Sequence, residues 1–106
     1  MNKKIIQPEL TPHAALKTIK DLAKNTDNVF LIPHAKQSMK KRQITLSQII
    51  ECLLKGTITE GPYHKIGADN WRVRMEYFSS GQCIKVIAEL ITNDNNEKII
   101  VITTFK

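Results

Sequence analysis

The sequence predicts an α+β fold of two layers, in which helices cover one face of an antiparallel sheet of four or five strands. Two observations carry this prediction. Apolar residues recur at helical spacing in most of the chain up to residue 56, whereas apolar and polar residues alternate after it, as they do in half-buried strands. Short polar turns join the alternating segments, and such links produce antiparallel neighbours.

A helix and a short strand open the pattern. Thr11 precedes a proline, which is typical of a helix start, and apolar spacing predicts a helix from about 12 to 25. The β-branched and aromatic run 29–32 predicts a short strand. Residues 1–28, a lead-in with this one amphipathic helix, are therefore predicted to be an N-terminal extension, and residues 29–106 the α+β domain.

Two further helices are expected in close succession. Pro33 suits the first turn of a basic helix, and no glycine or proline stops that helix before Gln43. Thr45 is the expected N-cap of a strongly apolar helix. Gly56 is expected to end that helix in the left-handed conformation.

Four strands are expected in the rest of the chain. Their predicted bounds are 57–60, 71–77, 83–91 and 98–105, with a break at Gly61–Pro62 and turns at 79–82 and 93–96. In the clearest of them Trp71 faces the core, and Arg72 and Arg74 lie on the opposite face.

Positive charge is concentrated in one window of the sequence. The chain has 106 residues, and 16 Lys and Arg against 10 Asp and Glu give a net charge of +6. No carboxylate side chain lies between Asp27 and Glu51, whereas Lys36, Lys40, Lys41 and Arg42 all fall in that interval. Such a patch attracts a polyanion: RNA, DNA, an anionic lipid or an acidic protein.

The basic helix also carries a histidine in its first turn. His34, Ser38, Lys41 and Arg42 are spaced to lie along one face, while Ala35 and Met39 supply an apolar face. An imidazole beside cations is what a phosphate-handling site needs, although a solvated helix face has the same composition. His64 and Lys65, expected in a loop, are a second candidate pair.

The strand arginines extend the cationic surface. Alternate strand residues are about 6.6 Å apart, close to the spacing of neighbouring phosphates, so Arg72 and Arg74 can grip a nucleic-acid backbone. Lys85 can add a cation from the next strand. The alternative is that these side chains only keep an exposed sheet face soluble.

The two cysteines give no sign of a metal or redox motif. Cys52 and Cys83 have neither CxxC spacing nor a neighbouring His/Cys cluster, so we expect reduced thiols, no metal and no cofactor. No apolar run approaches the roughly 20 residues of a membrane span, and the first residues lack a signal-peptide core. A cytoplasmic protein without membrane contact is the expectation.

Several motifs resemble those of domain-of-unknown-function family 4258, a group of small bacterial proteins. The most specific part is the run His-Ala-x-x-x-Met-x-x-Arg-x-Ile-Thr that begins at His34. It is followed by the helix end Lys-Gly-Thr-Ile at 55–58 and the final strand Val-Ile-Thr-Thr-Phe at 101–105. The resemblance covers residues 29–106.

This resemblance implies a fold and an activity. The family looks related to the RelE-like toxins and, more distantly, to barnase and colicin-type ribonucleases, in which a helical segment packs on a four-stranded antiparallel sheet. These proteins cut RNA without a metal and are often paired with a neutralising partner. The resemblance therefore implies a toxin module whose partners are RNA and an acidic antitoxin or immunity protein.

Family positions map onto three residues of this chain. His34 matches the family's histidine, Arg42 its second arginine and Thr103 its final-strand threonine. The chain departs from the family where Ser38 replaces an arginine, Lys85 a histidine and Phe105 a tyrosine.

These positions and the basic residues define the expected site. The candidate catalytic residues are His34, as base or acid, Arg42 and Arg72, as phosphate clamps, and Thr103, as a positioning group. The candidate nucleic-acid contacts are Lys36, Lys40, Lys41, Arg74 and Lys85.

Three functions remain open from the sequence. The first is a metal-independent endoribonuclease-like toxin module, and the second is a catalytically inactive module of the same fold that binds nucleic acid. The third is an interaction subunit that docks a partner protein. The sequence does not indicate the oligomeric state.

Overall fold

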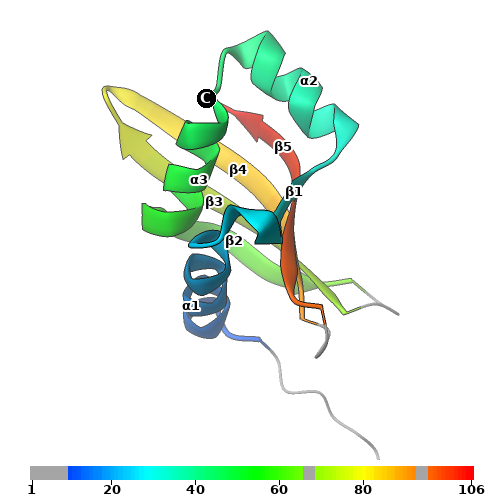
Figure 1. Ribbon diagram of the computed structural model, residues 1–106. Helices are drawn as coiled ribbons and strands as arrows, with labels where there is room; N and C mark the ends of the chain where they lie inside the picture. The colour runs from blue at the N-terminus through cyan, green and yellow to red at the C-terminus, as the bar shows by residue number, and fades with distance from the viewer. Residues whose placement is uncertain (1–9, 66–68, 93–95) are drawn as a thin grey trace, which may run out of the picture.

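One layer of the protein is a five-stranded sheet, and three helices pack against it (Figure 1). The computed structural model describes residues 10–65, 69–92 and 96–106. The strands are β1 (Val29–Leu31), β2 (Thr57–His64), β3 (Asn70–Ser79), β4 (Gln82–Ile91) and β5 (Lys98–Phe105), and the helices are α1 (Pro12–Ala23), α2 (Pro33–Arg42) and α3 (Leu46–Lys55), with a short 3₁₀ turn η1 (Thr26–Asn28) before β1. The two-layer α+β prediction is confirmed.

Strand order in the sheet is β1-β5-β4-β3-β2. The four long strands are antiparallel neighbours, as predicted, but β1 pairs parallel to β5, with Val29 opposite Ile99 and Leu31 opposite Val101. The sheet is therefore mixed. A parallel pair needs a long crossover, and here α2, α3 and three strands lie between the two partners in the chain.

The core lies between the sheet and helices α1 and α3. Alternate residues of β3 and β4, among them Val73, Met75 and Val86, are almost completely buried. From the helices, Ile19 and Leu53 are fully buried in the same cluster. Burying a side chain of this size contributes roughly 1.5–3 kcal/mol. Because Ile19 lies in α1, this helix contributes to the core that stabilises residues 29–106.

Side-chain caps begin two of the helices where the sequence predicts them. The Thr11 hydroxyl accepts a hydrogen bond from the backbone N–H of Ala14 at 3.1 Å. At α3, Thr45 and Gln48 form a reciprocal capping box, with distances of 2.8 and 3.1 Å. Each cap is worth about 1 kcal/mol of helix stability.

Gly56 does not adopt the left-handed conformation that the sequence suggested. Its φ of −78° and ψ of −175° are extended. Glycine is needed there for space, because a Cβ would lie 2.5 Å from the Cys52 carbonyl oxygen and 2.7 Å from that of Glu76. The end of α3 thus lies directly against β3.

Gly61 and Pro62 do not end β2, which was expected to stop at Glu60. The strand continues to His64 with register shifts against β3 on either side of Glu60. Proline is tolerated because β2 is an edge strand, where one side of the backbone has no ladder partner.

One prediction near the end of β2 was wrong, and one at the start of β3 is confirmed. His64 lies in a strand and stacks on Trp71 with ring centroids 4.4 Å apart, so the predicted loop position was wrong. Trp71 is a core residue as predicted.

The predicted lead-in at 1–9 and the turn positions 93–95 lie outside the described residues. Within the described part of the chain, no helix has the length and apolar character needed to cross a membrane.

Candidate functional site

Helix α2 carries four cations that face solvent. Lys36, Lys40, Lys41 and Arg42 are all exposed, and none of them forms an ion pair with another residue that the structure describes. The sequence explains this, because no carboxylate lies between Asp27 and Glu51. Unpaired cations on one helix attract an extended polyanion.

The opposite side of α2 packs beside β5. Ala35 is fully buried and Ser38 is 9% exposed. The backbone N–H of Ile32, directly before the helix, donates to the Val101 carbonyl at 3.3 Å. Ser38 therefore faces β5 and not solvent, contrary to the expected face shared with His34, Lys41 and Arg42.

A chain of hydrogen bonds joins β5 to the first turn of α2. The Ser38 hydroxyl donates to the His34 carbonyl oxygen at 3.0 Å, and the hydroxyls of Ser38 and Thr103 are 3.0 Å apart. Because the single Ser38 proton is used on His34, Thr103 is the donor in the second bond. Thr103 thus fixes the backbone of the turn whose exposed side chain is His34.

Spacing along α2 separates His34 from Arg42. The two residues are eight positions apart in a continuous helix, which corresponds to about 12 Å along its axis. Both are exposed, but this spacing suits contacts to successive nucleotides better than contacts to a single phosphate.

A β-bulge in β5 brings Thr103 and Phe105 onto the face of the sheet that α1 and α3 leave open. The register shifts between Ile87 and Ala88, which pair with Thr103 and Val101, so Ile102 is the extra residue. Without it, Thr103 would follow Val101 on the core face. The open face therefore combines Thr103 and Phe105 with the strand arginines, a combination that strict alternation does not predict.

Arg72 is engaged by a buried carboxylate. Its guanidinium donates to Glu89 at 2.7 Å, and Asn70 donates to the other Glu89 oxygen at 2.9 Å. The Glu89 side chain is 8% exposed and that of Arg72 is 51% exposed. Burial raises the pKa of Glu89, but the hydrogen bonds from Arg72 and Asn70 outweigh this effect and hold the pKa below its usual value.

Arg74 lies between two carboxylates. Its terminal nitrogen is 3.6 Å from Glu60 and its Nε is 3.3 Å from Glu76. Its guanidinium carbon also lies 5.1 Å from the centre of the Phe105 ring, and the Lys85 ammonium lies 5.6 Å from the same centre. Cations at this distance interact favourably with the ring.

The open face is slightly hollowed beside these arginines. A cavity of about 60 Å³ is lined by Glu60, Tyr63, Arg72, Arg74 and neighbouring apolar side chains. Tyr63 is 60% exposed. Across the described ranges, no group of three or more His, Cys, Asp or Glu side chains is arranged to hold a metal ion.

The structure thus arranges the predicted site residues in three groups. His34, Arg42 and the three lysines lie on α2, with Thr103 bonded to its buried side. Arg74 and Lys85 flank Phe105, and Arg72 lies in the Glu89 pair. The sequence analysis missed the roles of Glu89 and Asn70. Their signal was the two-residue turn at 80–81, which places Arg72 and Glu89 opposite each other in the hairpin.

Most of this chain matches one known protein family. Residues 31–106 match the family described as Domain of unknown function (DUF4258). The chain belongs to this family. No curated protein and no solved structure matches it.

The DUF4258 match contains every predicted site residue. It begins at the last residue of β1 and runs through α2, α3 and the four long strands. Helix α1 lies outside the matched range, although Ala15, Ile19 and Ala23 are buried in the common core.

Proposed function

We propose that this DUF4258 protein is a metal-independent endoribonuclease-like toxin module that acts on RNA along α2 and the adjoining open sheet face. The observation that carries the proposal is the attachment of a histidine-bearing, unpaired cationic helix to β5 through Thr103 and Ser38. RNA would lie along the four α2 cations and reach Lys85 and Phe105 on the sheet. A relationship to the RelE-like toxins and the barnase and colicin-type ribonucleases is part of the same proposal.

The proposed chemistry needs one proton acceptor and several cations. The ribose 2′-oxygen attacks phosphorus while its proton passes to the His34 imidazole. The bond from phosphorus to the 5′-oxygen breaks, and the leaving oxygen takes a proton from water. Proton transfer of this kind contributes roughly 10²- to 10⁴-fold. Arg42 and the α2 lysines would bind phosphates of the neighbouring nucleotides and so hold the scissile phosphate at His34.

A binding module without catalysis is the second candidate, and the ion pairs of two arginines favour it. Arg72 is already paired with Glu89, and Arg74 lies between Glu60 and Glu76. These engaged arginines have fewer donors for a phosphate than free ones. In this candidate, RNA or an acidic antitoxin or immunity protein would bind to α2 without being cut.

The experiment is incubation of the purified protein with a mixed RNA pool in excess chelator. His34→Ala is compared with His13→Ala, which removes an exposed histidine from α1. We expect cleavage to 2′,3′-cyclic phosphate ends by the native protein and by His13→Ala, and a loss of about 10²-fold or more in His34→Ala. Undiminished cleavage by His34→Ala would exclude the assigned role.

Absence of cleavage by the native protein would favour the second candidate. Retention of RNA at low salt with release at high salt would then identify binding through phosphate contacts. We also propose a cytoplasmic location, which cell fractionation of a tagged protein tests.

A further inference from the structure

Helix α3 presents a second apolar side, which the core covers only in part. Its core side is completely buried, with Ile49 and Leu53 at 0% exposure. Leu46, Ile50 and Leu54 recur every four residues on an adjoining side. Leu46 is 46% exposed, and the other two are half-buried. An apolar stripe two helical turns long therefore remains in contact with water.

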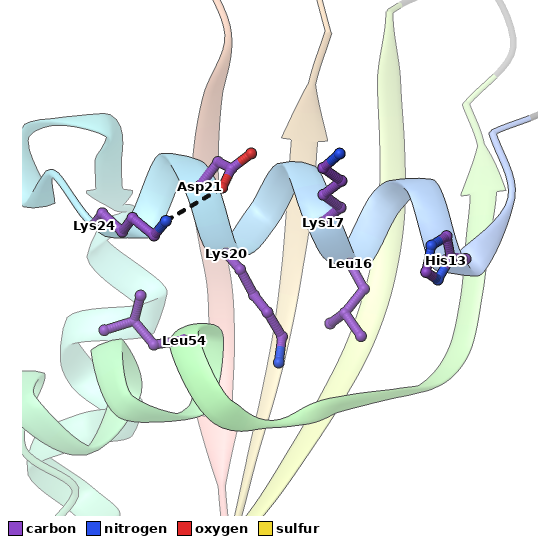
Figure 2. Close-up of a pocket in the computed structure, with 7 residues that line it drawn as sticks. All are labelled: His13, Leu16, Lys17, Lys20, Asp21, Lys24 and Leu54. Atoms are coloured by element: carbon purple, nitrogen blue, oxygen red, sulfur yellow. Dashed lines mark ion pairs between the residues drawn. The ribbon is translucent and has the colours of Figure 1, made fainter.

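Two hollows adjoin this stripe and share Leu54. One, of about 440 Å³, lies between α1 and α3. Figure 2 shows Leu16 and Lys20 of α1 pointing into it, with Leu54 of α3 beside them. The other, of about 460 Å³, lies over α3 and includes Leu46 and Ile50. We call these two adjoining hollows the α1–α3 groove; their apolar lining comprises Leu16, Leu46, Ile50 and the shared Leu54.

The rim of the groove is positively charged. Its two carboxylates are each paired within their own helix, Asp21 with Lys24 at 3.5 Å and Glu51 with Lys55 at 3.6 Å. Lys17 and Lys20, in contrast, form no ion pair with any residue described. Lys20 thus places an uncompensated cation beside Leu16 and Leu54, and Lys17 adds a second cation on the other side of α1 (Figure 2).

We propose that the α1–α3 groove docks an amphipathic helix of a partner protein whose apolar face is flanked by Asp and Glu. The three apolar residues of α3 span eight positions, or about 12 Å, which matches anchors at i, i+4 and i+7 of such a helix. An acidic flank would meet Lys20, and Lys17 adds to the positive charge of α1. A second copy of this chain fits poorly, because it would bring two more uncompensated lysines to the contact, while Asp21 and Glu51 are already paired within their own helices.

This surface is separate from the proposed RNA site. The residues that line the groove belong to η1, α1 and α3, and α1 and α3 pack on the core face of the sheet. Thr103, Arg74 and Lys85 lie on the open face. One wall, α1, also lies outside the family match. The inference goes beyond the proposed function and does not depend on RNA cleavage.

The test uses a synthetic amphipathic peptide with leucines at i, i+4 and i+7 and glutamates on both flanks. Its controls are the same peptide with lysines replacing the glutamates, and one with the leucine positions scrambled. Isotope-labelled protein is titrated with each, and amide shifts are followed by NMR. We expect saturable binding of the acidic peptide alone, with shift changes confined to α1 and α3.

Substitutions locate the contact. Leu46→Gln and Lys20→Glu should each weaken peptide binding about tenfold, through the loss of an apolar anchor and a charge pair respectively. Lys36→Glu makes the same charge change on α2 and should leave peptide affinity unchanged. Leu46→Gln should leave RNA binding and cleavage at native levels, so failure of one proposal is distinguishable from failure of the other.

Three results would overturn the proposal. They are equal binding of the acidic and scrambled peptides, shift changes centred on α2, and an equal loss of affinity in Lys20→Glu and Lys36→Glu. Vesicles containing phosphatidylserine form a further arm. Vesicle binding that depends on Lys20, without peptide binding, would assign the groove to a membrane surface instead.

Discussion

Thr103 donates a 3.0 Å hydrogen bond to Ser38, a residue 65 positions earlier in the chain. Ser38 in turn donates to the carbonyl oxygen of His34. The position of α2 relative to the open sheet face is thereby fixed at the helical turn that carries the candidate base.

This link predicts non-additive effects on stability. Ser38→Ala and Thr103→Val should each lower the free energy of unfolding by about 1–2 kcal/mol, and the double variant should lose about 1 kcal/mol less than the sum. Urea unfolding at neutral pH measures all four proteins. Strict additivity would show that the two hydroxyls do not interact.

The hydrogen bonds of Glu89 with Arg72 and Asn70 predict that the stability of the protein depends on pH. The pKa of Glu89 is lowered in the folded state, so its stabilising contribution is present at neutral pH, above the unfolded pKa, and is lost as the pH falls through the folded pKa. Glu89→Gln should therefore lower the free energy of unfolding by about 1–3 kcal/mol at neutral pH and by much less in strong acid. A difference between native and variant that does not change with pH would contradict this account.

The two thiols should differ in reactivity. Burial, with smaller effects from Cys83 and Glu76, raises the pKa of the Cys52 thiol to about 12. Cys52 is fully buried, whereas Cys83 is partly exposed. An aromatic disulfide reagent at mildly alkaline pH should modify one thiol per folded chain and two after denaturation, and peptide mapping should identify Cys83 as the first. Rapid modification of Cys52 in the folded protein would contradict its burial.

Two glycines should respond differently to alanine. Gly56→Ala places a Cβ against two backbone carbonyls and should cost about 2–4 kcal/mol. Gly81→Ala meets no atom within 4 Å but requires a residue with a φ of +79°, which costs about 1–2 kcal/mol. Thermal unfolding of both variants measures which is less stable. A Gly56→Ala variant more stable than Gly81→Ala would contradict the close contact described for Gly56.

Local patterns predicted much of the fold because their causes are local. A threonine cap reaches only three residues ahead, and alternation within β3 and β4 depends only on the pleat. Thr11, Thr45 and the buried positions of β3 were therefore accessible from the sequence. Gly56 was misassigned because glycine serves both as a left-handed cap and where two backbones approach closely, and only the second depends on β3.

The candidate site was less predictable because it depends on register. The bulge at Ile102 moves Thr103 to the open face, and alternation within one strand contains no information about a bulge. Ser38 appeared to belong to the solvent face of α2 until its partner on β5 was known. The Arg72 and Glu89 pair could have been found from the two-residue turn between β3 and β4.

The RNA affinity of two double charge-reversal variants tests whether α2 binds RNA, and it does so whether or not the protein cuts RNA. Lys36→Glu with Lys41→Glu changes α2, and Lys17→Glu with Lys20→Glu makes the same charge change on α1. Binding of a labelled single-stranded RNA is followed by fluorescence anisotropy. For the α2 variant we predict at least tenfold weaker binding and a plot of log affinity against log salt concentration that is shallower by more than about 1. For the α1 variant we predict near-native binding. Equal weakening by the two variants, or native affinity in the α2 variant, would contradict the assignment of RNA to α2.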